Sequence, residues 1–300
     1  MNSMVLSLSN TLADAVARAG RAVVAVNARR RGSSTGVHWR PGVVVTADHT
    51  VRMDDEITIT RPDGRPLPAT LAGRDPGTDL AVLTVPDAEL PVAELGDADS
   101  LKVGHPVLAL GPGPTASWGV VSAVSGRWHT WRGGEIDRLL RLDLVLYPGF
   151  SGGPLVDLDG RIVGINTSGL SRHTPVAIPV ATVSRVSDEL LTRGHVARGY
   201  LGLALHPVRL PETLAHTLGL ASRTGLIVVN VEAGGPSSAA GLLIGDVLVT
   251  LDGAPVGETA DVQAALGSQR VGSTVRAQII RAGASAQVEI TVGDRPRGRR

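Results

Sequence analysis

The most informative stretch of the sequence is Pro148-Gly149-Phe150-Ser151-Gly152-Gly153-Pro154, which lies between two runs typical of β-strands. Glycines on both sides of a serine leave room for backbone N–H groups to approach a substrate carbonyl. Ser151 is therefore a candidate nucleophile, and the amides of Gly149 and Ser151 are the candidate donors of an oxyanion hole. Glycine-rich turns that contain serine are common, so this assignment depends on partners elsewhere in the chain.

A serine nucleophile needs a base within hydrogen-bonding distance and a third group that orients the base. His49 follows an apolar run in Thr46-Ala47-Asp48-His49-Thr50-Val51. Asp79 precedes an apolar run in Asp75-Pro76-Gly77-Thr78-Asp79-Leu80-Ala81-Val82-Leu83. Because active-site residues are often displayed at strand ends, we predict a triad in which His49 is the general base, Asp79 its orienting acid and Ser151 the nucleophile.

The regions around these residues are rich in β-type sequence. Between residues 21 and 180, short runs of Val, Ile, Leu and Thr alternate with Gly and Pro. Many short strands closed by turn residues favour a barrel or a sandwich. Helical patterns are predicted at residues 8–18 and 182–193, the second stopped by Gly194. A further segment of about one hundred residues has the mixed pattern of a small α+β domain.

Three segments resemble, in order, the catalytic blocks of the HtrA (DegP-like) serine proteases: residues 46–51, residues 75–83, and residues 148–154 with 161–166. The order His, Asp, Ser is that of the chymotrypsin-like fold. The resemblance implies a mostly β protein, with a chymotrypsin-like double β-barrel protease domain followed by a small α+β PDZ domain.

The PDZ resemblance lies in Gly199-Tyr200-Leu201-Gly202-Leu203, followed by residues 228–231, 235–242 and 244–248. A glycine-containing loop can direct N–H groups at a terminal carboxylate, and the next strand can pair with the peptide. We therefore expect Tyr200, Leu201, Gly202 and Leu203 to bind C-terminal peptides.

The predicted organisation has four parts. Residues 1–20 form an N-terminal helical segment, residues 21–194 the protease domain, residues 195–293 the PDZ domain, and residues 294–300 a basic disordered tail.

The resemblance implies an ATP-independent endopeptidase that cleaves unfolded or misfolded polypeptides, is regulated through its PDZ domain and assembles as a homotrimer through the N-terminal segment. Trypsin-like specificity requires an acid six residues before the nucleophile, where this chain has Val145. An apolar primary pocket formed with Val145 predicts cleavage after small or aliphatic residues.

The sequence also departs from the family pattern. Ala47, Asp48 and Thr50 are unusual neighbours for the histidine, and Phe150 replaces the usual Asn before the nucleophile. A charge at Asp48 could alter the protonation of His49, and the ring of Phe150 could hinder substrate access. The alternative to an active protease is therefore a weak or inactive chaperone or PDZ scaffold.

An α/β-hydrolase is a second alternative, because residues 149–153 also fit the nucleophile-elbow pattern. That fold needs a helix directly after the serine and a histidine later in the chain. Residues 154–160 are instead typical of a strand and a turn. We predict that the later histidines are surface or loop residues: His173, His195, His206 and His216.

Composition excludes several classes of function. The formal net charge of +1 calls for no nucleic-acid partner, and the absence of cysteine excludes disulfides and thiolate catalysis. No pair of histidines has convincing metal-site spacing, so we expect no metal and no cofactor. Residues 1–10 lack the pattern of a signal peptide, and no stretch reaches membrane-spanning length. The chain as written is therefore expected to be cytoplasmic, or periplasmic if an export signal has been removed.

Overall fold

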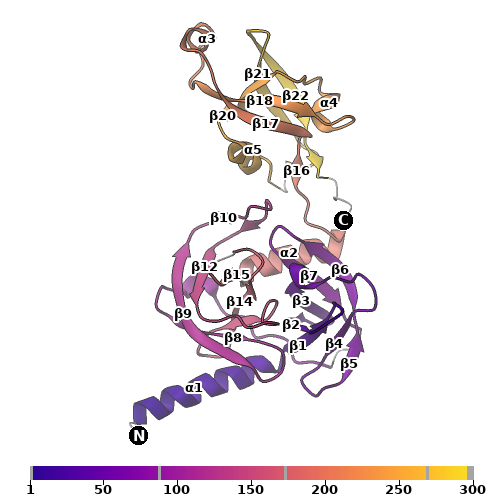
Figure 1. Cartoon of the computed structure of the whole chain (residues 1–300), viewed down its shortest axis with the longest axis vertical. Coiled ribbons are helices and arrows are strands. Elements are labelled where there is room, and N and C mark those ends of the chain that lie inside the picture. Colours follow the sequence, from indigo (N-terminus) through magenta and orange to yellow (C-terminus); the bar gives the residue numbers. More distant parts are fainter. Residues whose placement is uncertain (1–2, 87–88, 172–173, 268–269, 296–300) are drawn as a thin grey trace. The chain divides into compact units, whose positions relative to one another are not determined.

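The computed structural model describes residues 3–86, 89–171, 174–267 and 270–295, and the chain divides into two compact units at Val196 and Ala197 (Figure 1). This division falls two residues beyond Gly194, where the sequence predicts the domain boundary. His173 and residues 296–300 of the predicted tail lie outside the described residues.

The first half of the protease unit is a seven-stranded antiparallel sheet in the order β5-β4-β1-β2-β3-β7-β6. Its strands are β1 (Val23–Asn27), β2 (Ser34–Arg40), β3 (Val43–Ala47), β4 (Thr58–Thr60), β5 (Pro66–Pro68), β6 (Thr70–Asp75) and β7 (Leu80–Thr84). The prediction of a double barrel describes this half only loosely, because β5 and β6 are the edges of the sheet. Strand β5 begins and ends with proline, which cannot donate a backbone hydrogen bond to a further strand.

The second half of the protease unit is a closed six-stranded barrel in the order β12-β15-β14-β13-β8-β9. Its strands are β8 (Pro106–Leu110), β9 (Ala116–Ser125), β12 (Leu139–Asp143), β13 (Pro154–Val156), β14 (Ile162–Thr167) and β15 (Val176–Pro179). A two-stranded hairpin of β10 (Trp128–His129) and β11 (Glu135–Ile136) interrupts the barrel sequence. The prediction of a mostly β protease domain is confirmed.

The largest core of this unit joins its two halves. Strand β3 is buried over its whole length: Val43 and Val45 pack in the shared core, and Val44 packs in a second core inside the first sheet. Burial of both faces explains why this strand is a continuous apolar run rather than an alternating one. The shared core therefore fixes the first sheet against the barrel.

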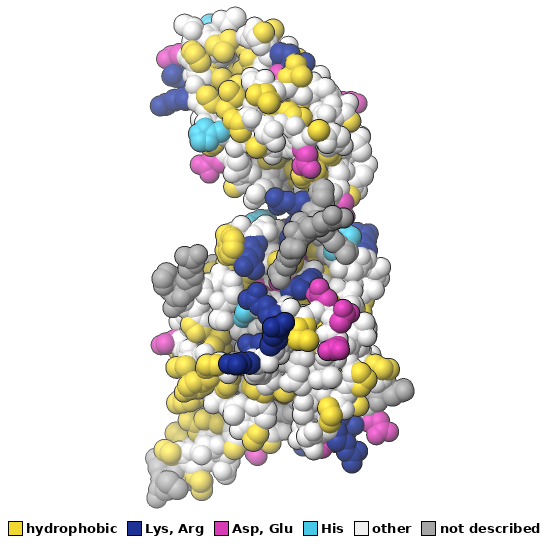
Figure 2. Space-filling view, turned by 45° about the vertical axis from the view of Figure 1, so that its right-hand side comes forward, with side chains coloured by type: hydrophobic (Ala, Val, Ile, Leu, Met, Phe, Trp, Pro, Cys, Tyr) yellow, Lys and Arg dark blue, Asp and Glu magenta, His cyan; other side chains and the backbone are white. Residues whose placement is uncertain are grey.

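Two helices cover the protease unit. Helix α2 (Val180–Arg193) packs Val183, Val186 and Leu190 into the shared core. It ends as predicted at Gly194, which has a φ of 72° and donates its N–H to the Leu190 carbonyl. Helix α1 (Ser3–Gly20) begins earlier than its predicted start, and its first turns expose apolar side chains (Figure 2): Met4, Val5, Leu6 and Leu8.

The second unit contains a six-stranded antiparallel sheet, and its described residues include three short helices. The sheet order is β17 (Leu203–Arg209), β18 (Thr224–Val231), β19 (Val247–Leu251), β21 (Thr274–Arg281) and β22 (Ala284–Thr291), with β20 (Ala254–Pro255) beside β19. The helices are α3 (Glu212–Thr217), α4 (Pro236–Ala239) and α5 (Thr259–Ala265). Strand β17 is an edge strand, as a peptide-pairing strand has to be.

The predicted start of the disordered tail is wrong. Asp294 belongs to β23 (Gly293–Asp294), which pairs with β16 (Gly199–Tyr200). The Arg198 N–H donates to Asp294 Oδ1 at 3.0 Å, and the Arg295 N–H donates to the Arg198 carbonyl at 2.9 Å. These contacts hold both ends of the second unit together, so its ordered part reaches at least Arg295.

An ion pair between the buried Asp246 and the partly exposed Arg281 holds the turn before β19. Asp246 accepts hydrogen bonds from Arg281 Nε at 2.8 Å and Nη2 at 2.7 Å, and from the Leu243 N–H at 2.8 Å. The hydrogen bonds from Arg281 hold the pKa of the Asp246 carboxyl below its usual value. This contribution to stability is present above the usual carboxyl pKa and is lost as the pH falls through the lowered one.

Candidate active site

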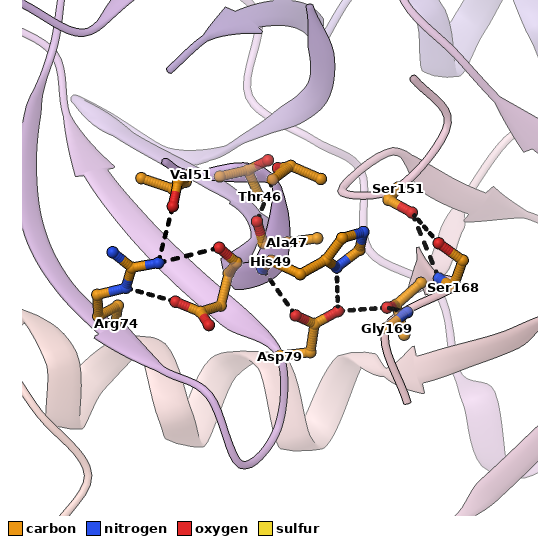
Figure 3. Close-up of polar contacts among 12 residues, drawn as sticks. Thr46, Ala47, His49, Val51, Arg74, Asp79, Ser151, Ser168 and Gly169 are labelled. Atoms are coloured by element: carbon orange, nitrogen blue, oxygen red, sulfur yellow. Dashed lines mark hydrogen bonds and ion pairs between the residues drawn. The ribbon is translucent and has the colours of Figure 1, made fainter. Parts of the chain in front are cut away.

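The pairing of β3 with β7 brings the predicted base and its orienting acid together. His49 lies in the 3₁₀ turn Asp48–Thr50 that follows β3, and Asp79 directly precedes β7. His49 Nδ1 is 2.7 Å from Asp79 Oδ2, and the His49 backbone N–H donates to Oδ1 at 2.9 Å (Figure 3). Because both carboxylate oxygens contact the histidine, the proton is assigned to Nδ1, which leaves Nε2 free to act as a base.

Two residues at the end of β14, which sequence analysis did not single out, complete the surroundings of Asp79. The Thr167 hydroxyl donates a hydrogen bond to Asp79 Oδ2, whose side chain is fully buried. A Cβ at Gly169 would lie 2.5 Å from Asp79 Oδ2 and 2.7 Å from His49 Nδ1, so only glycine fits. In the sequence, the only indication of their role is that a threonine and a glycine follow an apolar run.

Ser151 lies in the loop between β12 and β13, on the side of His49 that is opposite Arg74 (Figure 3). Its Oγ is 3.1 Å from the Ser168 hydroxyl and accepts the Ser168 N–H at 3.3 Å. Within the described residues, no hydrogen bond joins Ser151 Oγ to His49 Nε2. Catalytic contacts of this kind are often long in the absence of substrate and tighten when substrate binds.

The loop before Ser151 presents two unused amides. Thr35 holds this loop, since its hydroxyl donates to the Gly149 carbonyl at 2.6 Å and its N–H donates to the Ser151 carbonyl at 3.3 Å. Gly149 has a φ of 96°, a conformation that favours glycine. In the described part of the chain, the N–H groups of Gly149 and Ser151 donate to no acceptor. Both are therefore available to a developing oxyanion.

A cleft of about 280 Å³ opens beside these groups. Its lining includes His49, Leu146, Tyr147, Ser151 and Ser168. Val145, the predicted pocket residue, is not among the described residues that line it and has 54% of its side chain exposed. The neighbouring Leu146 is the aliphatic side chain among the described residues that line the cleft.

Phe150 points into the protein instead of the cleft. The side chain is 4% exposed, and its ring packs edge-to-face on Tyr147 with a centroid separation of 5.5 Å. A Cβ on Gly111 would lie 2.3 Å from the Phe150 ring, so the ring occupies space that only glycine leaves open. The aromatic residue therefore anchors the oxyanion loop rather than obstructing it.

The peptide-binding residues predicted in the second unit have different placements. Leu201 is buried in the core, and Tyr200 belongs to β16. Gly202 has a φ of 73°, and Leu203 begins the edge strand β17. Among the described residues, the N–H groups of Leu201 and Gly202 donate to no acceptor, which leaves two adjacent donors beside an open sheet edge.

The described residues contain neither a cluster of metal-binding side chains nor a membrane-spanning helix. No group of three or more His, Asp or Glu side chains within residues 3–86, 89–171, 174–267 and 270–295 could hold a metal ion. Over the same ranges, no helix has the length and apolar character needed to cross a membrane.

Comparison with known proteins defines the class. Residues 34–165 match the model of the trypsin-like peptidase domain, and residues 199–292 match the PDZ domain model. The chain is thus built as a trypsin-like peptidase domain followed by one PDZ domain.

The solved structures narrow the class to a family. The HtrA-type protease AlgW with a tripeptide is 33% identical, with a TM-score of 0.72 over 95% of this chain and 97% of AlgW. The serine endoprotease from Yersinia pestis is 29% identical, with a TM-score of 0.75 over 96% of this chain and 98% of that one. The chain belongs to the HtrA family of serine proteases, and the resemblance seen in the sequence is confirmed.

Curated relatives agree with this family but are longer. The probable periplasmic serine endoprotease DegP-like of Pseudomonas fulva is 35% identical over 263 residues, which are 86% of this chain and 54% of the relative. Its counterpart in Pseudomonas putida strain W619 is 36% identical over 264 residues, which are 85% of this chain and 54% of that relative. The chain thus spans about half the length of these relatives.

Packing of Phe150 against Gly111 yields a test of the oxyanion loop. We expect Gly111→Ala to push the Phe150 ring and its loop aside, lowering kcat/KM for peptide substrates by about ten- to a hundredfold. The same variant should lose about 1–3 kcal/mol of unfolding free energy because the site is overpacked. Steady-state kinetics and urea unfolding would measure the two effects.

Gly126→Ala is the matched control, because a Cβ there would meet no atom within 4 Å. We expect it to leave both quantities close to those of the unmodified protein. Unchanged kinetics in Gly111→Ala would contradict the role of Phe150 as an anchor.

Proposed function

We propose that this protein is a serine endopeptidase that hydrolyses peptide bonds in unfolded or misfolded polypeptides without ATP. The observation that carries the proposal is the His49–Asp79 pair beside Ser151, in a cleft where two backbone amides are free. Relatives named serine endoproteases support the same activity.

The proposed cycle has two halves. His49 Nε2 takes the Ser151 proton as Oγ attacks the carbonyl carbon, and the amides of Gly149 and Ser151 stabilise the oxyanion. The intermediate collapses when His49 returns the proton to the leaving amine, which departs and leaves an acyl-enzyme. Water then attacks the ester with His49 again as base, and the acid product and free Ser151 are released. Asp79 stays ionised and stabilises the imidazolium.

This cycle uses only water and side chains of the protein, which is why no nucleotide is required. An extended segment has to enter the cleft, so flexible polypeptides are better substrates than folded ones. Cleavage after small or aliphatic residues is favoured by the apolar side chain of Leu146 in the cleft lining, which could not pair with Arg or Lys.

Digestion of casein tests the activity and its specificity together. We expect the unmodified protein to cleave casein without ATP, and Ser151→Ala to retain less than about a thousandth of the rate. Mass spectrometry of the products should place Val, Ala or Leu before most cuts. Equal cleavage by both proteins would rule out Ser151 as the nucleophile, and cuts mainly after Arg or Lys would overturn the proposed pocket.

The same assay separates the enzyme from its main alternative. If neither protein cleaves casein but both prevent aggregation of an unfolded protein, the chain is an inactive chaperone or scaffold. The contact of Ser151 Oγ with Ser168, in place of a bond to His49, is the observation that keeps this alternative open.

We further propose that the second unit binds C-terminal peptides and thereby regulates the protease. The free amides of Leu201 and Gly202 can donate to a terminal carboxylate, while the open edge of β17 can pair with the residues before it. Neutral hydrogen-bond donors of this kind discriminate strongly between a carboxylate and an uncharged amide.

Peptide titration tests this binding. With Ser151→Ala as the receptor to prevent cleavage, we expect a Val-ending peptide to bind at least about tenfold more tightly than its C-terminal amide. Isothermal titration calorimetry would measure both affinities. Equal affinities would exclude carboxylate capture, and an unaltered casein rate at saturating peptide would exclude regulation.

We also propose a homotrimer assembled through α1. The exposed fractions of Met4 (77%), Val5 (57%), Leu6 (48%) and Leu8 (45%) place four apolar side chains in water at the start of the helix (Figure 2). Contiguous exposed apolar surface of this kind is typical of an interface.

Light scattering tests the assembly. We expect a mass three times that of one chain, falling to that of one chain when Val5 and Leu8 are both replaced by Ser. The matched control is Asn10→Ser, an exposed polar position on the same helix that should leave the mass unchanged. A monomeric unmodified protein would contradict the proposal.

A further inference from the structure

The residue next to the proposed general base is a buried acid. Asp48 directly precedes His49, and its side chain is fully buried. A buried carboxylate is costly unless it is paired with a cation and hydrogen-bonded. The buried Asp48 carboxylate therefore needs a feature of this chain that compensates for its charge.

That feature is Arg74, at the end of β6. Its Nε donates to Asp48 Oδ1 at 2.5 Å, and its Nη2 donates to the carbonyls of Asp48 at 3.1 Å and Val51 at 2.8 Å. Its Nη1 also donates to Asp54 Oδ1 at 3.3 Å. One guanidinium therefore ties down the turn on both sides of His49, using the fixed fork that Arg alone provides.

The turn that carries His49 is thus held from two directions. Asp79 binds the backbone N–H and the ring of the histidine, while Arg74 binds the turn from the other side (Figure 3). Neither contact uses Nε2, the atom that faces the substrate.

We propose that Arg74 is a positioning residue for His49, and that it also balances the charge of the Asp48 carboxylate beside the base. The proposal rests on the proposed protease function. The contacts of Arg74 fix the direction of the imidazole, and small displacements of a reacting group lower rates steeply.

The charge balance around His49 gives the sign of the electrostatic effect. The charged groups on the packed elements are Asp79 before β7, Asp48 in the turn itself, Arg74 on β6 with its second partner Asp54, and Arg29, which lines the same cleft. Removing Arg74 takes a positive charge away from the neighbourhood of Asp48 and His49, which favours a protonated imidazole. The base is then lost at a higher pH, so the acidic limb of the pH–rate profile moves upward.

Four variants separate geometry from charge. Arg74→Met removes both and should lower kcat about ten- to a hundredfold with little change in KM, while raising the acidic limb by about half a pH unit. Arg74→Lys keeps the positive charge but loses the planar guanidinium that binds several acceptors at once. We therefore expect kcat to fall while the acidic limb of the pH–rate profile stays where it is. Asp48→Asn keeps the acceptor for Arg74 but removes the negative charge, so kcat should persist with the limb lowered.

The double variant Arg74→Met with Asp48→Asn removes both charges. Its limb should return to the position of the unmodified protein while kcat stays low. This variant also covers the case in which Arg74→Met fails to fold, because it removes the buried negative charge together with the guanidinium. The matched control is Arg65→Met, an exposed arginine in the β4–β5 turn whose side chain is 78% accessible, and it should change nothing.

A readout that needs no proteolysis keeps this test distinct from that of the protease itself. In the Ser151→Ala background, NMR can follow the titration midpoint of the His49 ring proton in each variant. The midpoints should shift in the same directions as the limbs, even if casein is never cleaved. A midpoint and a kcat that are both unchanged in Arg74→Met would overturn the proposal, as would equal shifts in Arg74→Met and Arg74→Lys.

Discussion

The candidate active site depends on one buried carboxylate. Asp79 uses one oxygen for the backbone and the other for the ring of His49, so the position and the tautomer of the histidine are set by a single side chain. Full burial makes these bonds obligatory, because an ionised carboxylate without partners would be strongly destabilising. The φ of 58° at Asp79 shows that the backbone accepts an uncommon conformation to place this group.

Close packing around that carboxylate restricts the neighbouring positions. Gly169 leaves space for Asp79 and His49, and Gly111 leaves space for the ring of Phe150. A Cβ at Gly152 would lie 2.2 Å from the Thr35 carbonyl oxygen. The glycines near the nucleophile thus have two functions: some free the backbone to adopt a turn, and others let a functional side chain approach the chain closely.

The two units illustrate different uses of β-structure. In the protease unit, β3 and β7 are buried inner strands, so residues at their ends are held rigidly at the candidate active site. In the second unit, β17 leaves one edge unpaired, which gives a peptide backbone somewhere to bind. A buried strand positions side chains, whereas an exposed edge offers its own hydrogen bonds.

Local sequence was sufficient for the features that depend on local physics. Apolar runs and turn residues predicted the strands, and Gly194 predicted the end of α2. Three short segments in order singled out His49, Asp79 and Ser151 as the proposed triad. Features made by contacts between distant segments could not be predicted in this way. The partner of Asp48 lies 26 residues away on another strand, the hydroxyl that meets Asp79 lies 88 residues away, and the ring of Phe150 packs over Gly111. Likewise, Leu146 rather than Val145 is among the described residues that line the cleft, and which of the two does so depends on how the loop after β12 folds. Sequence patterns report the conformation of a segment, but the environment of a side chain is made by whichever segments fold against it.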